Sequence, residues 1–137
     1  MPANPRRKSR IAALQALYEA DVSHHDPSAA LARLCEEEGL TEAQNAFARD
    51  LLAGVIEQRE AIDAIIHRAA PQWPVEQLSA IDRNILRLAI REILMNNGAP
   101  IRAAINEAVE LAKSFGSDNS AKFVNGVLGS VSLTLAR

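Results

Sequence analysis

The sequence predicts an all-α fold with six or seven helices in two small bundles, and three observations predict it. Apolar residues make up 48% of the 137 residues while aromatic residues make up only 4%. The apolar content is therefore mostly aliphatic, a composition typical of helical proteins. Apolar side chains recur every three or four residues along most of the chain, and no segment alternates apolar and polar residues as a half-buried strand would.

Three helices are predicted in the first half of the chain. The first covers about residues 6–22, the second about 28–38, and a long third helix runs from about 41 to 70. Thr41 is a residue type that caps helix N-termini. Gly54 within the third helix costs about 1 kcal/mol relative to Ala, and it indicates a site of close packing.

A rigid connector, Pro71-Gln72-Trp73-Pro74, follows the third helix. Two prolines in four residues restrict the backbone and end a helix. We therefore expect one domain over 1–137 with a boundary here, between subdomains of about 1–70 and 75–137.

Three further helices are predicted after the connector. The first starts at a capping box formed by Ser79 and Asp82 and ends near residues 96–98. The second has Pro100 as its first residue, and the last follows a turn of capping residues at 117–120.

No catalytic, cofactor or metal site is indicated. A single cysteine, Cys35, excludes an internal disulfide framework and a multi-cysteine zinc site. The three histidines lack metal-ligand spacing, and no glycine-rich phosphate loop is present. No apolar run approaches the roughly 20 residues of a membrane span. We expect a cytoplasmic protein that is not an enzyme and does not bind membranes.

Charge is distributed unevenly. The first ten residues contain four basic and no acidic side chains, whereas the remaining residues carry a net charge of −6. Arg6, Arg7 and Arg10 share one face at the start of the first helix, and Lys8 adds to the charge. Cations there oppose the helix dipole, at about 0.3–1 kcal/mol each, which a bound polyanion would offset. The alternative is a solvated basic tail.

A second candidate surface lies far away in the sequence, at Asn119, Ser120, Lys122 and Phe123. The start of a helix presents unpaired backbone N–H groups, and Phe123 could stack on a base as aromatic residues do in RNA-binding proteins. Phe123 also begins an apolar stripe, so a core position is the alternative. For Tyr18 in the first helix, too, an RNA contact and a core position are the two alternatives.

A third surface is indicated by the charged stretch from Glu76 to Arg91, which includes Asp82 and Arg83. It suggests a protein partner, and the alternative is a surface helix covered with salt bridges.

Five sequence blocks carry a resemblance to a known family. In this order and spacing they are similar to the NusB family of bacterial transcription antitermination factors over nearly the whole chain. The blocks are RRKSR with ALQALY at 6–18, RDLLAGV at 49–55, DRNILRLA at 82–89, AINEAVELAKSFG at 104–116 and KFVNGVL at 122–128.

The resemblance implies two three-helix subdomains, no enzymatic activity and a heterodimer with NusE, which is also a ribosomal protein. The pair would bind the boxA element of nascent ribosomal RNA and join the complex that makes RNA polymerase resist termination. RNA contacts carry over to Arg6, Arg7, Lys8, Arg10, Tyr18, Asn119, Ser120, Lys122 and Phe123. The NusE surface carries over to Glu76, Leu78, Asp82 and Arg83.

Some features leave alternatives open. Asn119 stands where the family commonly has an acidic residue, and Trp73 has no assigned role. Some relatives self-associate, so a homodimer is possible. NusB-like domains also precede the catalytic part of ribosomal RNA cytosine methyltransferases, and a pure protein scaffold is a third possibility. RNA binding would be distinguished by its steep salt dependence.

Overall fold

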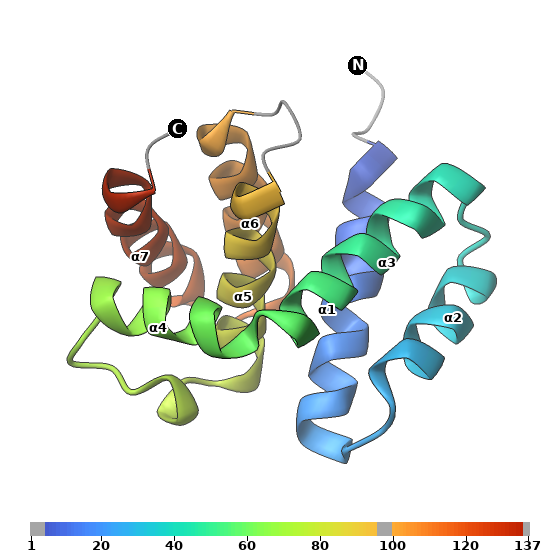
Figure 1. Ribbon diagram of the computed structural model, residues 1–137, viewed down its shortest axis with the longest axis horizontal. Coiled ribbons are helices and arrows are strands. Elements are labelled where there is room, and N and C mark those ends of the chain that lie inside the picture. The colour runs from blue at the N-terminus through green and yellow to red at the C-terminus, as the bar shows by residue number, and fades with distance from the viewer. Residues whose placement is uncertain (1–4, 96–99, 136–137) are drawn as a thin grey trace.

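A computed structural model describes residues 5–95 and 100–135, and these residues form helices without any strand (Figure 1). The all-α prediction is confirmed. The elements are α1 (Pro5–Ser23), α2 (Pro27–Glu37), α3 (Glu42–Glu57), α4 (Arg59–Ala69), the 3-10 turn η1 (Val75–Gln77), α5 (Ala80–Met95), α6 (Ile101–Phe115) and α7 (Ser120–Thr134). The predicted helix end at 96–98 lies outside the described residues.

The long helix predicted over about 41–70 is in fact two helices. The backbone of Gln58 leaves helical geometry, with φ −108° and ψ 19°, and separates α3 from α4. Apolar periodicity does not detect this break, because Leu51 before it and Ile62 after it are buried in the same core. Thr41 caps α3 as predicted, in a complete capping box with Gln44.

The helices form a group of three and a group of four. α1 packs against α2 and α3, while α4 joins α5, α6 and α7 because it packs on α5 and α7. α1 and α3 also pack on α5 (Figure 1). The buried apolar residues of both groups therefore form one core. The division into subdomains of about 1–70 and 75–137 stays a prediction.

Small residues on α1 explain its central position. Ala12, Ala13 and Ala16 are buried, and short side chains allow neighbouring helices to approach closely. Gly54 acts in the same way on α3. A Cβ atom at Gly54 would collide with the side chain of Arg91, which crosses over it from α5. Close packing at Gly54 is thus confirmed.

Candidate nucleic-acid interface

The basic start of α1 is held in place by α3. The side-chain amide of Gln44 donates a hydrogen bond to the Pro5 carbonyl at 2.8 Å. In return, the Ser9 hydroxyl donates to the Gln44 carbonyl at 2.9 Å. The same Gln44 closes the capping box with Thr41. The first turn of α1 therefore has a defined position.

Arg6, Arg7 and Lys8 lie on the surface, as predicted. The Arg6 guanidinium sits 4.5 Å from the centroid of the Phe47 ring, in cation–π geometry. Arg7 donates from Nε and Nη2 to the two carboxylate oxygens of Glu107, at 3.2 and 2.9 Å. This bidentate pair uses two of the five N–H donors of Arg7, so the remaining donors can bind another anion.

Arg10 is not on the surface, which corrects the expectation that it shares an exposed basic face with Arg6 and Arg7. It is only 5% exposed. Its Nε and Nη2 atoms donate to Glu92 at 2.8 and 2.6 Å, and its Nη1 atom lies 3.4 Å from Glu107. One helical turn after Arg6 and Arg7, α1 packs on α5, and the Arg10 side chain meets acids from both α5 and α6. Arg10 therefore ties three helices together.

Glu107 connects this buried cluster to the surface. The hydrogen bond from Arg7 lowers the pKa of Glu107, and the charges of Arg10 and Arg7 add to the effect, against the opposing effect of burial. Glu107 is therefore ionised at neutral pH and compensates both arginines.

A groove brings the two predicted RNA-binding regions together. Arg7 from α1, Lys113 from α6 and Lys122 from α7 line it, together with the side chains of Asn106 and Asn125. The two acidic residues of the groove are both paired with cations that also line it. Glu107 pairs with Arg7, and Glu110 pairs with Lys113 at 3.1 Å. Lys122 makes no ion pair with any of the described residues. The groove thus offers cations and amides to an anionic chain.

The start of α7 departs from the prediction at Ser120. Ser120 is 2% exposed, and its hydroxyl accepts a hydrogen bond from the Ser117 backbone N–H at 2.9 Å. Its side chain therefore closes the turn before α7 instead of lying on the surface. Asn119 and Lys122 are exposed as expected.

Phe123 and Tyr18 occupy different surroundings. Phe123 is half-buried against the core and meets Trp73 edge to face, with ring centroids 6.3 Å apart. The core and surface roles considered for Phe123 are therefore geometrically compatible. Tyr18 is 39% exposed on α1, but it does not line the groove that holds Arg7 and Lys122.

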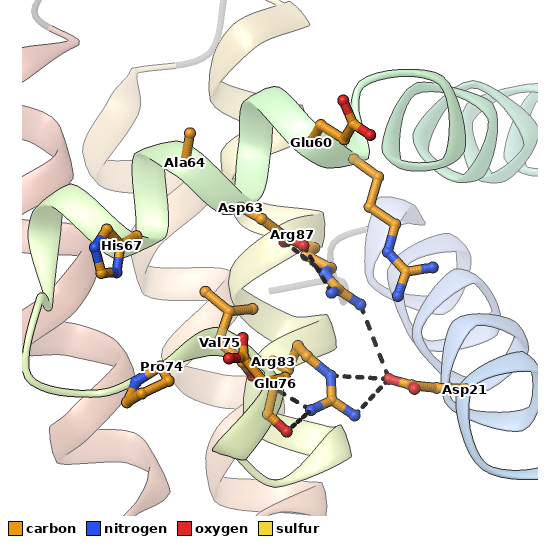
Figure 2. A pocket seen from close by; sticks show the side chains of 11 residues that line it. Asp21, Glu60, Asp63, Ala64, His67, Pro74, Val75, Glu76, Arg83 and Arg87 are labelled. Atoms are coloured by element: carbon orange, nitrogen blue, oxygen red, sulfur yellow. Dashed lines mark hydrogen bonds and ion pairs between the residues drawn. The ribbon is translucent and has the colours of Figure 1, made fainter.

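Arg83 organises the predicted partner surface. Its Nε and Nη2 atoms donate to Asp21 on α1 at 3.0 and 2.9 Å. Its Nη1 atom donates to the backbone carbonyls of Val75, Glu76 and Leu78 at 3.3, 3.3 and 2.9 Å. Figure 2 shows Arg83 between Asp21 and this turn. The guanidinium of Arg83 therefore acts inside the fold and positions η1.

The other members of this surface differ in exposure. Glu76 is exposed, whereas Leu78 is half-buried against the core. Asp82 is partly buried, and its backbone N–H donates to the Ser79 hydroxyl at 3.2 Å. Ser79 thus caps α5 as predicted. The Asp82 Oδ1 atom is buried without a hydrogen-bond partner among the described residues.

Arg87 extends the same cluster into a cleft between α1, α4 and α5. It forms a bidentate pair with Asp63 at 2.8 and 2.9 Å and lies 3.8 Å from Asp21 (Figure 2). Burial alone would raise the pKa of Asp21. Hydrogen bonds from Asn84 and Arg83, with the charges of both arginines, outweigh burial and lower it.

Two classes of site are absent from residues 5–95 and 100–135. No group of three or more His, Cys, Asp or Glu side chains there could hold a metal ion. None of the helices in this part of the chain has the length and apolarity needed to cross a membrane.

Comparisons with known proteins decide the family. The model of the NusB family matches residues 7–133. The chain belongs to the NusB family. A transcription antitermination protein NusB from Dehalococcoides mccartyi is 53% identical over 131 residues, covering 96% of this chain and 92% of the relative. The corresponding protein from Chloroflexus aggregans is 48% identical, covering 94% of this chain and 87% of the relative.

Solved NusB structures share the fold. A structure of T. maritima NusB superposes with a TM-score of 0.89 at 36% identity, covering 95% of this chain and 92% of that one. A crystal structure of the antitermination factors NusB and NusE in complex with double-stranded RNA superposes with a TM-score of 0.86 at 25% identity, covering 97% and 99%. The helical arrangement described above is thus the NusB fold.

Proposed function

We propose that this NusB-family chain is a non-catalytic, RNA-binding transcription antitermination factor. Together with the ribosomal protein NusE, it binds the boxA element of nascent ribosomal RNA. The RNA-bound pair joins the antitermination complex on RNA polymerase, in the cytoplasm. Support comes from the family match and from the relative that was solved with NusE and RNA.

The single observation that carries the proposal is the groove shared by α1, α6 and α7. Residues far apart in the sequence, Arg7 and Lys122, line one continuous surface. Lysine and arginine contacts to phosphates supply most of the salt-dependent affinity of proteins for nucleic acid. Amide side chains such as Asn106 and Asn125 add donors and acceptors for sugars and bases. The groove therefore suits a single RNA strand.

The proposed NusE surface is Glu76, Leu78, Asp82 and Arg83. These residues form one patch because Arg83 binds the backbone carbonyls of residues 75, 76 and 78. The patch combines an exposed acid with a half-buried apolar side chain, a mixture typical of the rim and core of protein interfaces. It is anchored to the C-terminal half of α1, whereas the RNA groove begins at the N-terminus of that helix. One chain can thus bind both partners at once.

The test is RNA binding with and without NusE. We expect the pair to bind a boxA oligonucleotide more tightly than a scrambled one of the same composition, and affinity to fall steeply with salt. Equal affinity for both oligonucleotides in the presence of NusE would overturn the boxA assignment. A salt-independent affinity would favour a pure protein scaffold instead.

A homodimer is a further proposal, because some members of the family self-associate. If a second copy covered the RNA groove, RNA would compete with self-association. Sedimentation of the chain with and without boxA RNA tests this, and we expect RNA to shift any dimer toward the monomer.

A further inference from the structure

Trp73 is the single tryptophan of the chain, and it is 53% exposed. Large aromatic side chains usually bury most of their surface. Trp73 instead stands beside the start of α7, where its ring meets Phe123 at 6.3 Å with an interplanar angle of 83°. The edge-to-face contact holds the indole in one orientation while leaving more than half of the residue open to solvent.

The two rings form a wall of a surface hollow of about 440 Å³. Lys122 and Asn119 contribute its polar side, and Gly126, one turn further along α7, leaves space where a side chain would project. The hollow therefore combines an aromatic surface, one cation and two amides, since Gln72 also lines it. This combination matches an unstacked nucleobase with its neighbouring phosphate, as aromatic and basic side chains bind single strands.

Lys122 also lines the groove that contains Arg7. The hollow and the groove of the proposed RNA path therefore meet at Lys122. A strand that places its phosphates along Arg7, Lys113 and Lys122 would reach Trp73 with its next nucleotide. Charge complementarity and the shared Lys122 favour RNA over an apolar ligand as the occupant.

We propose that Trp73 and Phe123 form a nucleobase subsite at the end of the RNA groove, with Lys122 holding the adjacent phosphate. This inference rests on the proposed RNA-binding function and extends it by one specific contact. It assigns a role to Trp73, for which the sequence offered none.

Gly126 provides a test that leaves both rings intact. No atom lies within 4 Å of the position that a Cβ atom would take there, so a side chain fits without collision. Gly126→Leu should fill the hollow and also favour the helix. Gly129→Leu is the matched control, because Gly129 is exposed on the same helix, is equally unobstructed and lies outside the hollow.

The first measurement is RNA affinity in complex with NusE. One stacked base corresponds to about a 5- to 150-fold change in affinity, so we expect a loss in that range for Gly126→Leu and for Trp73→Leu, and none for Gly129→Leu. The salt slope should stay unchanged in all three variants, because no phosphate contact is removed. An unchanged affinity of Gly126→Leu would overturn the subsite.

The second measurement uses RNA that lacks one base at a time. One abasic position should weaken binding to the unmodified protein and have no effect on Gly126→Leu, because the base has already lost its site. RNA should also quench the fluorescence of Trp73 in the unmodified protein and not in Gly126→Leu. If every abasic RNA affects both proteins equally, the base binds elsewhere.

These outcomes separate the subsite from the proposed function. If the unmodified protein with NusE does not distinguish boxA from scrambled RNA, the proposed function fails. If it does distinguish them while Gly126→Leu binds normally, only the subsite fails. A Trp73→Leu variant that loses thermal stability but keeps its RNA affinity would make Trp73 a purely structural residue.

Discussion

An ion-pair cluster anchors each end of α1, and the two clusters differ in the sign of the charge that α1 contributes. At the N-terminal end, α1 supplies the cation Arg10, and α5 and α6 supply the acids Glu92 and Glu107. Toward the C-terminal end, α1 supplies the acid Asp21, and α5 supplies the cations Arg83 and Arg87. Both clusters join the first group of helices to the second.

The side chains of the two clusters are buried to different extents, and this difference indicates different roles. The Arg10 and Glu92 side chains are 6% and 4% exposed, while those of Arg83 and Asp21 are 13% and 18% exposed. Removing one partner of a buried pair leaves an uncompensated charge, so the first cluster is mainly structural. The second cluster borders an open cleft and positions the backbone of residues 75–78. It can therefore affect both folding and the proposed partner surface.

The largest expected effect is on the deeper cluster. Arg10→Ala should lower the free energy of unfolding by about 3–5 kcal/mol, because the Glu92 carboxylate would stay buried without its partner. Urea denaturation measures this change. Arg7→Ala is the control, since Arg7 lies on the surface three residues earlier and its loss should leave the urea midpoint almost unchanged. Equal urea midpoints for Arg10→Ala and Arg7→Ala would show that the buried cluster stabilises the fold no more than the surface pair does.

The more open cluster should show a smaller loss of stability together with a loss of binding. Asp21→Asn should cost about 1–3 kcal/mol, because Arg83 would lose its charged hydrogen-bond acceptor. NusE binding should weaken as well, as the turn at 75–78 loses its anchor. Asp63→Asn removes only the pair with Arg87, so it should lower stability while leaving NusE affinity closer to normal. Equal NusE affinities in both variants would argue against this positioning role.

The pH dependence of Asp21 has a definite sign. Its folded pKa lies below the ordinary value of an aspartate, so its stabilising contribution is complete above about pH 4 and is lost as the pH falls through the folded pKa. The difference in stability between the unmodified protein and Asp21→Asn should therefore shrink below about pH 4. Thermal melting from pH 7 to pH 2 measures it, and a constant difference would show that Asp21 does not titrate in this way.

A charge reversal at Asp82 tests the proposed NusE surface directly. Asp82→Lys should weaken NusE binding by roughly tenfold, because a reversed charge at an interface repels the partner. Partly exposed charges contribute only about 0–1 kcal/mol to folding, so the melting temperature should change little. Calorimetry with NusE and a thermal melt on the same variant measure the two effects. A large drop in melting temperature with normal NusE binding would make Asp82 a capping residue only.

The smallest expected effect is on the salt dependence of RNA binding. Arg7→Ala and Lys122→Ala should each reduce the slope of log affinity against log salt by about 0.7, the value for one lost phosphate contact on a single strand. Titrations at several salt concentrations measure it. Lys8→Ala tests whether the rest of the basic face contributes, since Lys8 is exposed but does not line the groove. An unchanged slope in Arg7→Ala would remove that residue from the RNA path.

Local signals in the sequence predicted local structure well. The capping residue Thr41 and the cap at Ser79 both lie where expected, because a cap depends on residues three or four positions apart. The break at Gln58 was missed because both sides of it bury apolar residues at helical spacing. The burial of Arg10 and Ser120 was not predicted either. Arg10 is buried by its contacts with the distant Glu92, and Ser120 by the way its hydroxyl accepts from the Ser117 N–H.

The sequence by itself determined the helical class, the positions of most helices, and the two basic and polar segments at the starts of α1 and α7. Helical periodicity specifies which residues share a face, but not which neighbouring helix covers that face. Only the tertiary structure decided that Arg10 is buried against Glu92 while Arg7 stays at the surface, and that Arg7 and Lys122 line one groove. It also placed Trp73 against Phe123. These outcomes depend on contacts between residues far apart in the chain. The residues come together only when α1 packs on α5, α7 packs on α6 and the connector at 71–74 folds back toward α7.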